Sequence, residues 1–399
     1  MNSWREVEFE AIFDISSSKR VLQEDWKSSG VPFYRAREIV KLARDGFVEN
    51  ELFISEDLYE TFQKKHGVPK TGDLMVSAVG TLGACYVVQS QDRFYYKDAS
   101  VLRFSPKQEL CSRFIQHAFR TPDIADQIQA SSGSTVGTYT IQRANKTQIK
   151  LPPLPEQRRI AAILDQADAL RTKRREALAQ LDSLTQSIFI EMFGDPAKNP
   201  LDWPSMALGS VASKFSDGPF GSNLKSEHYV EAGVRVIRLQ NIGVNEFVDR
   251  DKAYVSERHF ETIKKHECRP GDVLVGTMGD PNLRACVLPD AIGLAINKAD
   301  CVQIRVNPKV ANSDFLCGLL NHPSTLLLAQ DLMHGQTRVR ISMGGLRGLE
   351  VPVPPISLQQ TFAERIKSAE ALKATHNAAL QELDRLFASL QHRAFQGEL

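Results

Sequence analysis

The chain has 399 residues, of which 42% are hydrophobic and 24% are charged, enough to build two or more separate cores. The formal net charge of +1 excludes a strongly basic protein, so a nucleic-acid-binding surface would have to come from local clustering of charge. No stretch reaches about 18 apolar residues and the N-terminus has no apolar run, so we expect neither a membrane span nor a secretory signal.

The sequence repeats itself once, at a spacing of about 200 residues. Gly72-Asp73-Leu74-Met75-Val76 reappears as Gly271-Asp272-Val273-Leu274-Val275, and Leu181-Asp182-Ser183-Leu184 reappears as Leu383-Asp384-Arg385-Leu386. This spacing excludes the short-period solenoid repeats. Two copies of such a unit predict a pseudo-symmetric protein with two similar working surfaces, which suits a target that is itself bipartite.

Residues 1–150 are predicted to form a mixed α/β domain. Runs rich in β-forming residues at 74–79 and 84–88 predict strands separated by turns. The spacing of apolar residues over 110–128 predicts one helix, which a Ser/Gly/Thr loop follows. We interpret the aromatic run at 94–96 as core, with stacking on nucleic-acid bases as the alternative.

A proline-rich junction follows at 151–155, and the chain then contains no Pro or Gly from 156 to 193. This segment predicts a helix about 57 Å long. The second half repeats the plan, with a second junction at 351–355 and a second long helix over 357–396. The predicted organisation therefore has four parts, which are residues 1–150, 151–200, 201–350 and 351–399.

Both long helices carry a heptad pattern, and the pattern of the first recurs 202 positions later in the second. The pattern predicts that the helices pack on each other, with independent packing of each helix on its own domain as the alternative. The predicted fold class is α+β, with two pseudo-symmetric mixed domains joined by two long antiparallel helices packed as a coiled coil. The predicted seam consists of Ile160, Leu164, Leu178, Leu181, Ile188, Phe362, Ile366, Leu380, Leu383 and Leu390.

The seam is interrupted at matching positions, by Arg171 and Arg174 in the first helix and by Lys373 and His376 in the second. Charges on a seam cost stability unless they are paired or reach solvent. One interpretation is a solvated helix surface with local pairing, such as Asp168 with Arg171. The other is a contact with phosphate or with a partner at the middle of the helix.

Several segments together resemble the specificity subunit of Type I restriction–modification systems. They are Leu154-Pro155-Glu156-Gln157-Arg158-Arg159-Ile160-Ala161 at the first helix and the segments 217–225, 236–242 and 335–338. The resemblance covers the whole chain, because it includes the order of domain, helix, domain and helix. The second junction departs from the pattern, since Gln359 has no Glu before it, although the nearby Ser357 can cap the helix.

The resemblance implies that each domain is a target recognition domain that reads one half of a split double-stranded DNA sequence. It implies that the two helices set the gap between the half-sites and dock two methylation subunits and the restriction/translocase subunits. S-adenosylmethionine, ATP and magnesium are expected on those partner subunits and not on this chain. The chain itself is expected to be a non-catalytic, cytoplasmic prokaryotic protein.

The motifs agree with a non-catalytic chain. The sequence has no Gly-x-x-x-x-Gly-Lys-Ser/Thr loop, no Asn/Asp-Pro-Pro-aromatic motif and no Gly-x-Ser-x-Gly elbow. Its six cysteines do not follow zinc-ligand spacing, so we expect free thiols and no metal site. Two alternatives stay open: a stand-alone DNA methyltransferase with duplicated recognition domains, and a coiled-coil scaffold that binds no DNA, which the near-neutral charge supports.

Base reading needs donors and acceptors that match the groove edges, and positioning needs groups that contact phosphates. Arg35 and Arg37 correspond to Arg238 and Gln240 in the repeat, and we interpret them as a shared segment that faces DNA. The alternative is that Arg35 and Arg238 are structural and that only their neighbours vary for specificity. Residues that flank the loops before each junction suit phosphate contacts, with plain connecting loops as the alternative. The candidate DNA-binding residues are Arg35, Arg37, Thr135, Arg143, Lys146, Ser222, Arg238, Gln240, Asn241, Gln336, Thr337, Arg338 and Arg340.

Overall fold

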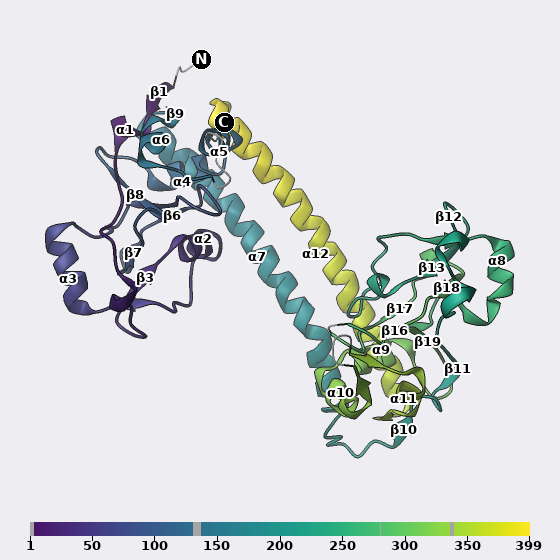
Figure 1. Cartoon of the computed structure of the whole chain (residues 1–399). Coiled ribbons are helices and arrows are strands. Elements are labelled where there is room, and N and C mark those ends of the chain that lie inside the picture. The colour runs from purple at the N-terminus through teal and green to yellow at the C-terminus, as the bar shows by residue number, and fades with distance from the viewer. Residues whose placement is uncertain (1–3, 131–136, 280, 336–338) are drawn as a thin grey trace. The chain divides into compact units, whose positions relative to one another are not determined.

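The computed structural model describes residues 4–130, 137–279, 281–335 and 339–399. The chain divides into two compact units, one made of Met1–Arg174 with Ala379–Leu399 and the other of Arg175–Ala378. Each unit contains one mixed domain and one part of each of two long helices, α7 (Leu154–Phe193) and α12 (Ile356–Gln396) (Figure 1). The units are described one at a time below.

The described part of the first domain contains three small sheets. An antiparallel sheet has the strand order β2-β8-β5-β6, a second has the order β4-β3-β7 with a parallel β3–β7 pair, and β1 pairs with β9. The strands are β1 (Arg5–Glu8), β2 (Phe13–Ser16), β3 (Val31–Tyr34), β4 (Phe53–Ile54), β5 (Leu74–Ser77), β6 (Cys85–Val87), β7 (Tyr95–Tyr96), β8 (Val101–Pro106) and β9 (Gln148–Leu151). The helices are α1 (Phe9–Ile12), α2 (Ala36–Asp45), α3 (Glu56–Lys65), α4 (Ser112–Ala118), α5 (Pro122–Gln129) and α6 (Ile141–Lys146).

The single helix predicted over 110–128 is in fact two helices, so this prediction is wrong. Helix α4 ends at Ala118, and α5 begins at Pro122. Proline lacks a backbone N–H and has a fixed φ, so it starts a helix more readily than it continues one. The apolar spacing continues across this break because both helices bury residues in the same core, Phe114 from α4 and Ile124 from α5 among them.

The second domain repeats this topology. The order β11-β19-β16-β17 matches the first antiparallel sheet. The second is matched by β14-β13-β18, with a parallel β13–β18 pair, which is the middle of a five-stranded sheet of order β12-β14-β13-β18-β15. The strands are β10 (Ser205–Ala207), β11 (Ala212–Ser216), β12 (Tyr229–Val230), β13 (Val234–Ile237), β14 (Tyr254–Val255), β15 (Glu267–Cys268), β16 (Val273–Gly276), β17 (Ala285–Val287), β18 (Ala295–Asn297), β19 (Cys301–Val306), β20 (Met333–His334), β21 (Arg340–Ile341) and β22 (Glu350–Pro352). The helices are α8 (Glu257–Thr262), α9 (Ser313–Asn321), α10 (Pro323–Leu328) and α11 (Met343–Gly348), with short 3-10 turns between them.

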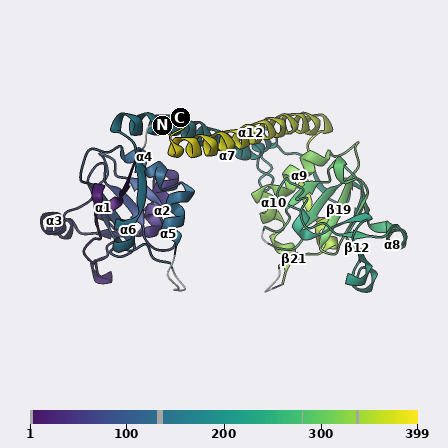
Figure 2. The ribbon, with the colours of Figure 1, turned by 90° about the horizontal axis from the view of Figure 1, so that it is seen from above.

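Each unit has its own hydrophobic core, and each core includes side chains from both long helices. In the first unit Leu164 of α7 and Phe387 of α12 belong to the core that contains Phe114 of α4. In the second unit Phe189 of α7 and Phe362 of α12 belong to the core that contains α9. Within each unit α4 or α9 lies next to the long helices, whereas α3 or α8 lies on the far side of the domain (Figure 2).

The two long helices pack together in both units, and they run antiparallel. In the first unit the beginning of α7 meets the end of α12, and in the second unit the end of α7 meets the beginning of α12. All ten predicted seam residues are buried or half-buried. The predicted α+β fold with two mixed domains and an antiparallel pair of long helices is therefore confirmed.

Candidate functional site

Arg35 and Arg238 occupy equivalent places at the start of a helical turn. The backbone N–H of Arg35 donates to the Glu38 carboxylate at 2.9 Å, and that of Arg238 donates to the Asn241 side chain, also at 2.9 Å. Glu38 begins the buried side of α2, and Asn241 closes the 3-10 turn Leu239–Asn241. The repeat therefore preserves a capping arrangement in which the third residue on satisfies the backbone of the arginine.

The guanidinium groups of both arginines are also held within their own domain. Arg35 pairs with Glu38 at 2.9 Å, and Arg238 pairs with Asp251 at 2.6 Å. Burial alone would raise the pKa of Glu38, but hydrogen bonds from Arg35 and Arg37 outweigh it and hold that pKa below its usual value. These contacts favour the structural interpretation of Arg35 and Arg238.

Asn241 is fully buried, so its side chain does not face a surface ligand. Its amide nitrogen donates to the carbonyls of Val248 and Arg250, at 3.0 and 2.8 Å. The amide oxygen accepts from the Arg238 N–H, so Asn241 caps the turn with one end of its side chain and holds the loop that follows with the other. This geometry supports a structural role for Asn241.

Arg37 and Gln240 remain exposed at equivalent positions of the repeat. Arg37 forms an ion pair with Glu51, and Gln240 donates a hydrogen bond to Asp251. Each of these candidates therefore lies at the surface beside an acidic residue from a neighbouring loop. The sequence reasoning missed these two acidic partners, because they follow at different distances in the two copies.

Arg143 and Lys146 both belong to α6, and the structure separates their environments. Arg143 donates to the carbonyls of Thr138 at 2.8 Å, Ile128 at 2.6 Å and Ala130 at 2.9 Å. Its donors thus hold the end of α5 and the chain before α6. Lys146 is exposed, so it is the better placed of the two to contact an external phosphate.

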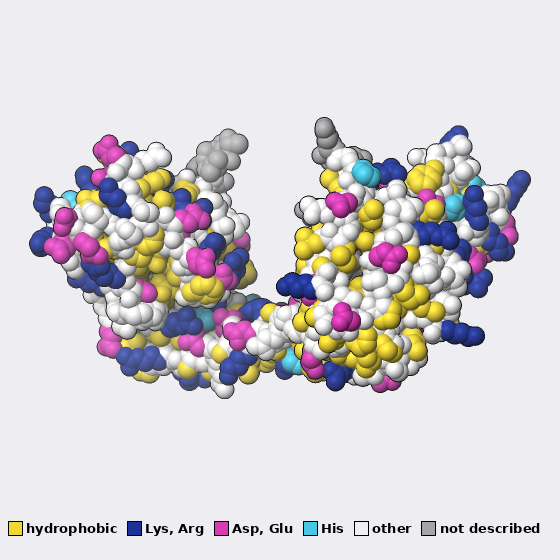
Figure 3. Space-filling view, turned by 90° about the horizontal axis from the view of Figure 1, so that it is seen from below, with side chains coloured by type: hydrophobic (Ala, Val, Ile, Leu, Met, Phe, Trp, Pro, Cys, Tyr) yellow, Lys and Arg dark blue, Asp and Glu magenta, His cyan; other side chains and the backbone are white. Residues whose placement is uncertain are grey.

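In the second domain, Ser222 and Arg340 are exposed. Ser222 lies in the 3-10 turn Gly221–Asn223, and Arg340 of β21 lies 4.0 Å from Asp300. Thr135, Gln336, Thr337 and Arg338 lie outside the residues that the structure describes. On the face drawn in Figure 3, Lys and Arg side chains are interspersed with Asp and Glu and form no single continuous basic field.

Ion pairs across the two helices satisfy the seam interruptions at Arg171 and Lys373. In the first unit Arg171 pairs with Asp384 at 2.6 Å and lies over the Phe387 ring at 4.3 Å. In the second unit Lys373 pairs with Asp182, also at 2.6 Å. Each pair maps onto the other under the repeat, so the two interruptions are one arrangement built twice. The predicted local pair between Arg171 and Asp168 is also present, at 2.8 Å.

A second charged cluster lies where α4 meets α7 in the first unit. His117 is buried, with its Nε2 atom 2.8 Å from Asp165, and Arg113 approaches the same carboxylate at 2.5 Å. Burial alone would raise the pKa of Asp165, but hydrogen bonds from His117 and Arg113 outweigh it and lower that pKa to about 2. Asp165 therefore anchors α4 to the long helix as a carboxylate.

A buried glutamine fastens each proline junction to its domain, and sequence reasoning gave it no role. Gln157 accepts from the Cys111 N–H at 3.0 Å and donates to the Pro152 carbonyl at 2.8 Å. Gln359 accepts from the Asn312 N–H at 2.8 Å and donates to the Pro354 carbonyl at 2.7 Å. The glutamine is present at both junctions, whereas the Glu that precedes Gln157 has no counterpart before Gln359. Comparison of the two repeats could therefore have identified the glutamine from the sequence.

The parts of the chain that the structure describes contain no group of three or more His, Cys, Asp or Glu side chains arranged to hold a metal ion. No described helix is long and apolar enough to cross a membrane. All six cysteines are unpaired, as predicted.

Comparison with known proteins places these features in a family. The family described as the Type I restriction modification DNA specificity domain matches residues 1–180. The C-terminal part of a Type I specificity subunit from Mycoplasma pneumoniae is 36% identical to the chain over 105 residues, which are 26% of this chain and 67% of that protein. The chain belongs to the Type I specificity subunit family. A specificity subunit is itself non-catalytic, and it determines which DNA target its restriction–modification complex recognises.

Other family members agree with this assignment. A protein named as a Type I restriction enzyme specificity subunit from Haemophilus influenzae is 28% identical over 174 residues, which are 43% of this chain and 42% of that protein. The match thus spans less than half the length of that relative. A crystal structure of the Type I S subunit from M. genitalium has the same fold, with a TM-score of 0.57 and 15% identity over 98% of this chain and 96% of that one.

Proposed function

We propose that this chain is the DNA-reading component of a Type I restriction–modification complex and that each of its domains reads one half of a bipartite target. The observation that carries the proposal is the contrast between repeated and variable positions. The capping arginines Arg35 and Arg238 repeat, whereas the exposed side chains two residues later differ, with Arg37 in one domain and Gln240 in the other. Arginine pairs best with guanine and glutamine with adenine, so the two half-sites should differ.

The long helices support a spacer role in this proposal. Both α7 and α12 run without interruption through both units, so each domain is fastened to the same two helices. The buried glutamines Gln157 and Gln359 fix the start of each helix to its domain. A rigid junction of this kind would convert helix length into the length of the gap between half-sites. The helices would also dock two methylation subunits, and the cofactors would bind to the partner subunits.

The test is DNA binding by the full chain, purified alone and together with its methylation subunits, at two salt concentrations. We expect sequence-specific retention that needs the partner subunits, because the chain alone has a net charge of only +1. Sequencing of methylated bases in a host that carries the complex should show one bipartite motif. Methylation by the chain alone would support the methyltransferase alternative, and the absence of DNA binding in the complex would support the scaffold alternative.

A further inference from the structure

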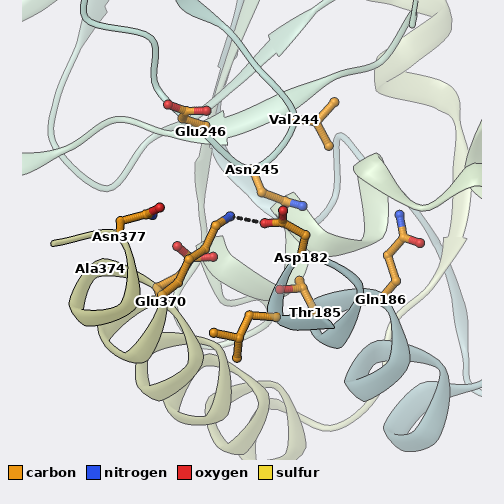
Figure 4. A pocket seen from close by; sticks show the side chains of 11 residues that line it. Asp182, Thr185, Gln186, Val244, Asn245, Glu246, Glu370, Ala374 and Asn377 are labelled. Atoms are coloured by element: carbon orange, nitrogen blue, oxygen red, sulfur yellow. Dashed lines mark ion pairs between the residues drawn. The ribbon is translucent and has the colours of Figure 1, made fainter. Parts of the chain in front are cut away.

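A polar groove of about 550 Å³ lies in the second unit, between α7, α12 and the loop at residues 244–246 (Figure 4). Three carboxylates line it, those of Asp182, Glu246 and Glu370, and one ammonium group, that of Lys373. Lys373 pairs with Asp182, and hydrogen bonding to that carboxylate raises the pKa of the lysine. Glu370 and Glu246 make no ion pair with any residue that the structure describes, so the groove keeps an excess of negative charge.

The repeat identifies the equivalent place in the first unit. Hydrogen bonds fix the correspondence: Ser112 and Ser313 each donate to the carbonyl of an equivalent glycine at 2.7 Å, and the junction glutamines match in the same way. Under this correspondence Glu370 matches Asp168, and Asn321 matches Arg120. The first unit therefore shows which side chains of the protein occupy the place that is a groove in the second unit.

In the first unit an arginine of the domain occupies this place. Arg120 pairs with Asp168 at 3.1 Å and donates to the carbonyl of Ala43 at 3.2 Å. Arg171 lies beside it and covers the ring of Phe387. The acidic position on the long helix is thus neutralised by two guanidinium groups, since Asp168 also pairs with Arg171.

In the second unit the groups that fill this place are replaced by smaller ones. Asn321 stands at the position of Arg120, and its amide turns to Asn245 and to the Ala285 carbonyl at 2.6 and 2.8 Å. Thr185 stands at the position of Phe387 and lines the groove. The carboxylate at this position is kept, as Glu370, while its arginine partner is missing from the domain.

We propose that the groove is a docking site for an arginine side chain of a partner polypeptide, with Glu370 as the main acceptor and Glu246 on the opposite wall. The planar guanidinium group matches carboxylate acceptors in a two-pronged geometry, and the first unit uses the same pairing. The proposal deepens the proposed function, on which it rests for the identity of the donor, a partner subunit. It also predicts that the two pseudo-symmetric ends of the helix pair are unequal, because only one has room for an external arginine.

The test is a titration of the full-length chain with N-acetyl-arginine amide, followed by NMR or calorimetry, with N-acetyl-lysine amide as the comparison ligand. We expect the arginine probe to bind more tightly than the lysine probe. Glu370→Gln should weaken arginine binding by about tenfold, the loss expected for a charge-assisted hydrogen bond. Glu364→Gln is the matched control, since Glu364 is exposed on the same helix outside the groove, and it should leave binding unchanged.

A second variant tests the groove by filling it. Asn321→Arg places an arginine where the first unit has one, so it should abolish binding of the probe. Should this variant not fold, the double variant Glu246→Gln/Glu370→Gln replaces it and should also abolish binding. Equal binding of the probe by the wild type and by these groove variants would overturn the proposal. If the purified complex fails to hold DNA while the titrations behave as expected, the proposed function fails and the arginine site stands.

Discussion

At the scale of single residues, the structure separates candidate side chains that are held inside the domains from candidate side chains that are exposed. Arg35, Arg143 and Asn241 spend their hydrogen-bonding groups on the backbone or on a buried carboxylate of their own domain. Arg37 and Gln240 also contact acidic residues, but their side chains lie at the surface. Recognition residues should therefore be sought one or two positions from the repeated ones.

We predict that Arg37→Ala relaxes discrimination in one half-site only and that Gln240→Ala relaxes it in the other. Both residues are exposed, so the free energy of unfolding should change by less than about 0.5 kcal/mol for Gln240→Ala. For Arg37→Ala it should fall by about 1 kcal/mol, because this substitution also removes a hydrogen bond to the buried Glu38 carboxylate. Binding to panels of DNA in which one base is varied at a time measures the effect. Uniform weakening across all sequences would assign these residues to phosphate contact, and an effect in both halves at once would contradict the assignment of one domain to each half-site.

We predict that Asp165 contributes stability that disappears in acid. Its folded-state pKa is about 2, below the unfolded value of 3.8, so the contribution is present above pH 4 and is lost as the pH falls toward 2. In urea unfolding at pH 5 and pH 3, Asp165→Asn should reduce the difference between the two free energies by up to about 1 kcal/mol, after allowance for partial exposure. An unchanged difference would mean that the carboxylate gains nothing from His117 and Arg113.

At the scale of elements, the long helices depend on how they begin. A helix start leaves backbone groups unsatisfied, and the proline junctions supply carbonyls that need donors. Gln157 and Gln359 meet this need from inside the domain, and both are almost fully buried. The arrangement explains why the junction tolerates the loss of Glu before Gln359 but keeps the glutamine.

We predict that Gln359→Ala destabilises the second unit by about 2–3 kcal/mol, because it leaves a buried N–H and buried carbonyls without partners. The neighbouring Gln360 is exposed, so Gln360→Ala is the control and should change stability by less than about 0.5 kcal/mol. Thermal or urea unfolding measures both. Equal effects of the two substitutions would show that the buried hydrogen bonds do not hold the junction.

At the scale of the whole molecule, much of the fold could be predicted because the sequence contains two copies of one unit. The repeat predicts two like domains, and the heptad pattern predicts which faces of α7 and α12 are covered and where Arg171 and Lys373 interrupt them. The ion pairs of these two residues across the helices were not predicted. The break at Pro122 was missed because apolar spacing continues across it.

The candidate site could be predicted only in part. Repetition marks structural and functional arginines alike, so the sequence could not separate Arg35 from Arg37. That distinction comes from burial, because Arg35 is half-buried and Arg37 is exposed. Burial is set by tertiary contacts and not by spacing.

We predict that insertion of one heptad into both long helices, after Arg174 and after Ala378, lengthens the gap in the DNA target. Seven residues add about 10.5 Å of helix, which corresponds to about three base pairs. Insertion into both helices keeps the seam in register, whereas insertion into one helix alone should destabilise the protein. Mapping of methylated bases in a host that carries the variant measures the gap, and an unchanged gap would refute the spacer role.

The pairing of the first and last strands of each domain has an evolutionary consequence. The first strand of each domain pairs with its last, β1 with β9 and β10 with β22, with Arg5 opposite Leu151 and Ser205 opposite Pro352. The chain thus enters and leaves a domain at one spot, directly before a long helix begins. Two genetic crossovers at these points would replace one complete domain with a domain from another gene. Under the proposed function, such an exchange would change half of the DNA target in one event and leave the long helices unchanged.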